Sequence, residues 1–101
     1  MNTEQLIDRI IQWGADRNLI KGSSPERQVK KTQEELDELK EAIGEENGPA
    51  IVDAIGDVAV TLIMIAAQVG IRFEDCLAAA YEEIKDRKGR MVDGIFYKNE
   101  D

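Results

Sequence analysis

The chain has 101 residues and a formal net charge of −8 at pH 7, from 21 acidic and 13 basic residues. This excess of negative charge argues against binding to nucleic acid or to an anionic membrane surface, because both would repel the protein. The length fits a single domain with one hydrophobic core.

The chain lacks some of the side chains that commonly bind metals, and this limits the kinds of metal site it can form. Cys76 is the single cysteine and there is no histidine, so the usual ligands of structural zinc are missing and any metal would be held by oxygen. The N-terminus is polar from Asn2 to Gln5 and has no features of a secretion signal. We therefore expect a cytoplasmic protein.

The first half of the chain predicts two helices. Leu6, Ile7, Ile10 and Ile11 recur at helical spacing and predict a helix that ends between residues 14 and 18. The second helix begins at Pro25, with Ser24 as its N-cap, and runs to about residue 44. Its apolar stripe is expected to face the core and consists of Val29, Leu36, Leu39 and Ile43, with Thr32 in the gap.

The third predicted helix is the most apolar one. It begins at Pro49 after an Asn-Gly turn and stops at Gly70. Within residues 58–67 only Thr61 is polar, a run too short to span a bilayer but typical of a helix buried on most sides in a bundle or a subunit interface. Gly56 lowers the helix propensity, so we interpret it as a point where a second helix or a ligand comes close.

The fourth helix is expected over residues 73–88, with Gly89 ending it. Its inward face would carry Cys76, Leu77, Ala80, Tyr81 and Ile84. Residues 91–101 are expected to be an irregular tail with a turn at Asp93-Gly94 and two short apolar arms that pack back on the helices. The sequence therefore predicts one all-α domain over residues 1–101, similar to a four-helix bundle.

Acidic residues on the second and third helices are the candidates for function. Glu35 borders the apolar stripe and Glu38 lies one turn further, whereas Glu34 falls on the solvated side. Asp53 and Asp57 share a face of the third helix that continues as apolar residues. A buried carboxylate must be protonated, paired or bound to a cation, and two acid pairs on adjacent helices favour the cation. A solvated glutamate-rich face and acids at a helix N-terminus are the simpler alternatives.

These residues resemble a known family. The run TQEELDE at residues 32–38, followed by Ile55-Gly56-Asp57, resembles the MazG-type all-α nucleoside triphosphate pyrophosphohydrolases. That family carries Glu-Glu-x-x-Glu on one helix and Glu-x-x-Asp on the next. The first pattern is present, but Ala54 stands where the second glutamate would be, and Asp53 is the candidate to replace it.

The resemblance implies hydrolysis of a nucleoside triphosphate at the α–β bond, giving a nucleoside monophosphate and pyrophosphate. It implies Mg²⁺, or Mn²⁺ in its place, held by Glu35, Glu38, Asp53 and Asp57. Catalytic roles fall to Glu34, Glu35, Glu38 and Asp57, with Glu34 as a base or as a group that orients the water. The basic residues at the end of the fourth helix would contact phosphate: Lys85, Arg87, Lys88 and Arg90.

The third helix also indicates a homo-oligomer, most simply a dimer, and the resemblance implies a dimer or a tetramer. Four short helices cannot cover its apolar residues on all sides, so a second copy would complete the core. Two other functions stay open from the sequence. One is the related phosphoribosyl-ATP pyrophosphohydrolase, and the other is a helical regulatory or interaction module that has lost catalysis.

Overall fold

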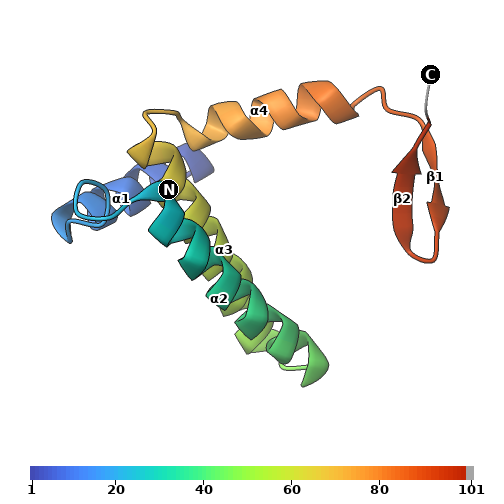
Figure 1. Ribbon diagram of the computed structural model, residues 1–101, viewed down its shortest axis with the longest axis horizontal. Coiled ribbons are helices and arrows are strands. Elements are labelled where there is room, and N and C mark those ends of the chain that lie inside the picture. Colours follow the sequence, from blue (N-terminus) through green and yellow to red (C-terminus); the bar gives the residue numbers. More distant parts are fainter. Residues whose placement is uncertain (100–101) are drawn as a thin grey trace.

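Four helices and one small hairpin make up the computed structural model, which describes residues 1–99 (Figure 1). The elements are α1 (Thr3–Asp16), α2 (Pro25–Gly44), α3 (Gly48–Gln68), α4 (Phe73–Ile84), β1 (Gly89–Val92) and β2 (Ile95–Lys98). Helices α2 and α3 run side by side, α1 crosses one end of this pair, and α4 projects away and carries the hairpin at its far end (Figure 1). The all-α expectation is confirmed, apart from this two-stranded sheet.

Local capping explains why the helices begin where they do. The Ser24 hydroxyl accepts from the N–H of Arg27 at 3.2 Å. The Asn47 side chain accepts from the N–H of Ala50 at 3.2 Å, so α3 begins one residue earlier than predicted. Asn2 and Gln5 form a reciprocal capping box that fixes the start of α1. All three contacts involve neighbours in sequence, and the one at Ser24 is predicted from the sequence.

The hydrophobic core lies between α1 and α3. It is centred on Ile7, Ile63 and Met64, with Ile10, Ile11, Leu19, Ile20 and Phe73 packed around them. Gly14 allows the two helices to approach, because a β-carbon there would overlap the end of the Met64 side chain. Around Gly56, by contrast, no described atom lies within 4 Å of where a β-carbon would stand. Within the single chain, the close approach between helices lies at Gly14, and no helix of the same chain approaches Gly56.

The contact between α2 and α3 is made by small and polar residues. Glu35 and Ala42 are the buried residues of α2, and the hydroxyls of Thr32 and Thr61 share a hydrogen bond of 2.8 Å across the two helices. The predicted inward stripe is wrong for three of its members, which are about half exposed: Val29 at 47%, Leu36 at 46% and Ile43 at 55%. They stand seven residues apart and form a stripe on the outer side of α2.

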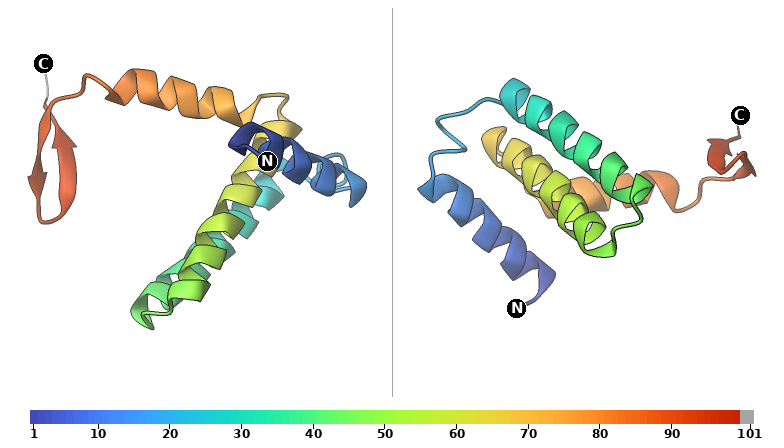
Figure 2. Two further views of the ribbon diagram at one scale, coloured as in Figure 1. Left: turned by 180° about the vertical axis from the view of Figure 1, so that it is seen from behind. Right: turned by 90° about the horizontal axis from the view of Figure 1, so that it is seen from below.

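Helix α3 lies between α1 and α2, as the right-hand view of Figure 2 shows. Its buried residues include Ala54, Thr61 and Met64. It also exposes an apolar stripe of its own, formed by Val52, Ile55, Leu62 and Val69. Each of the two central helices thus presents an uncovered apolar stripe, which is the surface expected of a subunit interface.

Among the described residues, α3 is also long and apolar enough to cross a membrane. Residues 58–67 alone are too short to cross a bilayer, but α3 as a whole is long enough. The short length of the apolar run therefore does not exclude a membrane span for α3. Core helices of soluble proteins meet the same criterion, and one such helix is weak support for a span. Asp53 and Asp57 would be costly in hydrocarbon. Only 28% of the apolar window of α3 is buried within the single chain, so the expected burial on most sides is not reached by α1 and α2 alone.

Two expectations for the C-terminal part are wrong. Helix α4 ends at Ile84 rather than residue 88, because the chain turns there and the N–H of Arg87 donates to the carbonyl of Ile84, three residues earlier. The side chains expected to face inward are exposed, Cys76 included, because α4 contacts the rest of the chain mainly near its start, at α3.

The expected irregular tail instead contains an antiparallel hairpin. Val92 pairs with Ile95 around the Asp93-Gly94 turn, where both turn residues have positive φ. Every residue of the two strands is exposed, so the arms do not pack back on the helices. Residues 100 and 101 of the expected tail lie outside the described residues.

Candidate metal centre

Three carboxylates converge where α2 faces α3. Glu35 and Glu38 stand three residues apart on α2, on one face of that helix, and Asp57 reaches them from α3. One oxygen from each lies within 4.8 Å of the other two. Glu35 is buried, Asp57 is half-buried and Glu38 is exposed, so the cluster opens to solvent on the Glu38 side.

The carboxylate of Glu35 has one oxygen paired and one free. Its Oε1 lies 3.3 Å from Nζ of Lys31, and the same ammonium lies 3.5 Å from Glu34. Its Oε2 is buried and has no hydrogen-bond partner among residues 1–99. A buried carboxylate oxygen without a partner is costly unless it is protonated or bound to a cation, and the neighbouring carboxylates are oxygen donors that a cation could share.

The pKa values of both other members of the cluster are raised, that of Glu38 chiefly by a neighbouring charge and that of Asp57 chiefly by desolvation. The pKa of Glu38 lies above its usual value, chiefly because the Glu35 charge is close. The pKa of Asp57 is raised first by desolvation and then by the charges of Asp53 and Glu35. Three oxygen donors of like charge, without histidine or cysteine, are the ligand set that suits Mg²⁺ or Mn²⁺. The residues present fit the metal that the resemblance implies.

These shifts predict how stability without metal depends on pH. A raised native pKa means that the native state holds its proton more tightly than the unfolded chain, so the stabilising contribution is complete in acid and is lost as the pH rises through the raised pKa. In EDTA, the wild type should therefore lose stability relative to Glu38→Gln as the pH rises from about 4 to 7. Melting curves of both proteins across this range measure the difference. A difference in melting temperature that stays constant with pH would contradict the raised pKa of Glu38.

Two predicted site residues lie outside the cluster. Asp53 is exposed and influences the site through its charge on Asp57. Ala54, at the position where the family glutamate would stand, is buried at 5% exposure. The side chain of Glu34 is 68% exposed and pairs with Lys31. Of the acids predicted from the sequence, the structure brings together Glu35, Glu38 and Asp57.

An apolar pocket of about 380 Å³ adjoins the cluster. Its lining comes from α1, α2, α3 and the segment after α1: Trp13, Leu19, Gln28, Lys31, Glu35, Asp57, Val60, Thr61 and Met64. Sequence reasoning left Trp13 out of the site and did not single out Lys31. No spacing signal identifies Trp13, because its role depends on how α1 crosses α3. The Arg17 guanidinium lies over its ring, 4.6 Å from the centroid.

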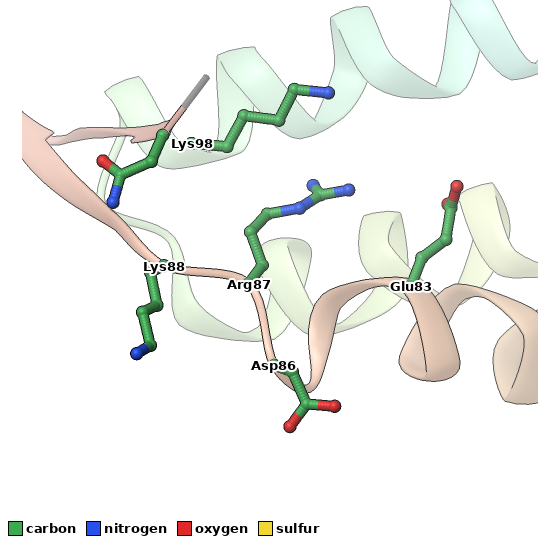
Figure 3. A pocket seen from close by; sticks show the side chains of 6 residues that line it. Glu83, Asp86, Arg87, Lys88 and Lys98 are labelled. Atoms are coloured by element: carbon green, nitrogen blue, oxygen red, sulfur yellow. The ribbon is translucent and has the colours of Figure 1, made fainter. Parts of the chain in front are cut away.

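The predicted phosphate-binding residues lie elsewhere in the chain. Arg87 and Lys88 line a cleft of about 610 Å³ between the end of α4 and the hairpin, together with Glu83, Asp86, Lys98 and Asn99. Figure 3 shows Arg87 and Lys98 extending to one side of this cleft, while Lys88 and Asp86 point to the other. Lys85 pairs with Glu82, and Arg90 is in β1. This cleft shares no residue with the acidic cluster, so the structure does not join the two predicted halves of the site within one chain.

Comparison of the sequence with known proteins identifies the family. The chain is 40% identical over 65 residues to an uncharacterized 18.2 kDa protein in the rep-hol intergenic region of Haemophilus phage HP1 (strain HP1c1). The alignment covers 64% of this chain and 40% of the phage protein, so the chain spans less than half of that relative. No solved structure matches the chain. Residues 23–92, which include the acidic cluster, match the profile of the MazG nucleotide pyrophosphohydrolase domain, and the chain belongs to that family.

Proposed function

We propose that this protein is a Mg²⁺-dependent nucleoside triphosphate pyrophosphohydrolase that cleaves the α–β phosphoanhydride bond. The observation that carries the proposal is the cluster of Glu35, Glu38 and Asp57, with its unpaired buried oxygen, at the edge of an apolar pocket. The family match supports nucleotide hydrolysis. The choice of the α–β bond comes from the resemblance to the family.

Each residue of the site has a part in this proposal. Glu35, Glu38 and Asp57 hold the cation, for which Mn²⁺ is an alternative to Mg²⁺. When bound, the metal would neutralise phosphate oxygens and lower the pKa of an attacking water. Trp13 and Val60 offer an apolar wall on which a nucleobase can stack, next to Asp57. Glu34 lies outside the cluster and contacts the site through Lys31.

We also propose that the protein works as a homo-oligomer. The exposed stripes on α2 and α3 and the exposed apolar side chains of α4, Leu77, Tyr81 and Ile84, need a partner to cover them. A second copy is the commonest solution for a soluble protein. The basic group of Lys85, Arg87, Lys88 and Arg90 projects with α4 away from its own cluster (Figure 1). In an oligomer this group could contact phosphate bound to another copy.

Pyrophosphate release across a panel of nucleoside triphosphates and phosphoribosyl-ATP, with Mg²⁺ and with EDTA, tests the activity. Mg²⁺-dependent release from one or more nucleoside triphosphates would support the proposal. Release from phosphoribosyl-ATP alone would identify the related enzyme of that specificity. Absence of release from every substrate, with Mg²⁺ binding intact, would favour a regulatory module.

The variant Asp53→Asn tests whether Asp53 replaces the missing family glutamate. Because Asp53 is exposed and outside the cluster, we expect the Mg²⁺ concentration at half-maximal activity to change by less than about threefold. Asp57→Asn serves as the comparison and should abolish activity. If both variants lose activity equally, Asp53 is a fourth ligand.

A further inference from the structure

Lys31 is the cation closest to the acidic cluster, and the proposed mechanism gives it no role so far. It stands one turn before Glu35 on α2, and its Nζ bridges Glu34 and Glu35. The two partners differ in burial: the side chain of Glu34 is 68% exposed, whereas that of Glu35 is 9% exposed. Lys31 therefore connects a solvated carboxylate with the most buried carboxylate of the cluster.

The ion pair uses one particular oxygen of Glu35. Lys31 contacts Oε1, and Oε2 is the buried oxygen without a partner. The last torsion of a glutamate side chain is broad, so an ion pair at one oxygen favours the orientation in which the other oxygen faces away from the ammonium. Carboxylates that bind metals are commonly held in this way by a hydrogen-bonding or charged neighbour.

We propose that Lys31, anchored by Glu34, is a positioning residue that orients Glu35 for metal binding. Lys31 fixes Oε1 and so leaves Oε2 available to a cation shared with Glu38 and Asp57. Glu34 acts indirectly, because its carboxylate holds the Lys31 ammonium in place. This inference rests on the proposed metal site, and it gives Glu34 a supporting role in place of a direct one with the attacking water.

The direction in which a substitution of Lys31 changes the affinity for a divalent cation distinguishes a positioning role from a simple charge effect. If Lys31 were only a nearby positive charge, removing it would tighten the binding of a divalent cation by reducing repulsion. If Lys31 positions Glu35, removing it weakens binding, and loss of such supporting contacts lowers metal affinity by about 10- to 100-fold in other sites. Lys30 is the matched control, since it is exposed, adjacent and forms no ion pair among residues 1–99.

Binding of Mn²⁺, measured by calorimetry and by the electron paramagnetic resonance signal of the free ion, tests this without any assay of activity. We expect Lys31→Met to weaken Mn²⁺ binding about tenfold. Lys30→Met should tighten it by less than about twofold, because its charge is screened. Lys31→Arg, which keeps the charge and the reach to both carboxylates, should restore most of the affinity.

A double-mutant cycle tests the part given to Glu34. Glu34→Gln should weaken Mn²⁺ binding about threefold in the wild type and have no further effect in Lys31→Met. Equal or tighter Mn²⁺ binding by Lys31→Met would overturn the inference and leave the proposed function intact. A wild-type protein that binds no Mn²⁺ would overturn the proposed metal site as well. Circular dichroism of each variant shows whether its helices are retained.

Discussion

Glu38→Gln and Asp57→Asn are each expected to abolish Mg²⁺-dependent pyrophosphate release. Each change removes one of three carboxylates whose oxygens lie within 4.8 Å of one another, and it nearly preserves side-chain shape. Loss of a ligand of this kind removes charge stabilisation at the reacting phosphate, so kcat/KM should fall by at least about 10²- to 10³-fold. A coupled pyrophosphate assay at saturating Mg²⁺ measures the loss.

The same two variants should be more stable than the wild type in EDTA. The pKa of each group is raised in the native state, Glu38 chiefly by Glu35 and Asp57 chiefly by desolvation, so removing either charge relieves an unfavourable term at neutral pH. Glu41→Gln is the control, an exposed acid on α2 outside the cluster, and it should change neither activity nor melting temperature appreciably. Wild-type turnover by either cluster variant would refute the assignment of the site.

Leu62→Glu is expected to dissociate or unfold the assembly. Leu62 is 41% exposed in the single chain and belongs to the outer apolar stripe of α3, which a second copy would cover. A carboxylate buried in such an interface without a partner costs several kcal/mol, so the association should weaken by at least about a hundredfold. Light scattering at micromolar concentration measures the mass of the wild type and of the variant.

Gln33→Glu adds the same charge at an exposed polar position of α2 and controls for charge alone. It should leave the mass of the assembly unchanged. A wild-type protein with the mass of one chain, still folded and active, would show that the exposed stripes serve another purpose. Retention of the oligomer by Leu62→Glu would place the interface away from this part of α3.

The starts of α2 and α3 could be predicted to within one residue because they depend on near neighbours. Ser24 and Pro25 define the start of α2, and Asn47 caps α3 through a contact three residues away. The end of α4 was harder to predict, since the segment after Ile84 consists of good helix formers and the first residue that usually stops a helix is Gly89.

The faces of α2 were predicted in part. An apolar stripe usually marks the inward side of a helix, and that rule places Val29, Leu36 and Ile43 in the core. In the structure Thr32, which was predicted to lie in the stripe, and Glu35, which borders it, do face α3, where the two helices meet through small and polar side chains. The rule identifies a surface that needs covering, but it does not distinguish a neighbour in the same chain from a second copy.

The site residues divide in the same way, into those that sequence spacing identifies and those that depend on how the helices pack. Spacing alone pairs Glu35 with Glu38, and an apolar helical face singles out Asp57. Spacing also favours Asp53, which the structure leaves exposed, since the direction of a side chain depends on the rotation of α3 about its axis. Trp13 and Lys31 are missed because their relevance follows from a pocket that exists only after α1, α2 and α3 are assembled.

The few contacts that α4 and the hairpin make with the rest of the chain bear on how the protein folds. The α2–α3 pair is a helical hairpin joined by a short turn, and helical arrangements of this kind form in microseconds to milliseconds. The C-terminal segment gains little from its own chain, and its order should depend on docking. Refolding should therefore show a fast phase independent of protein concentration and a slower phase that accelerates with concentration. The melting temperature should rise with concentration for the same reason.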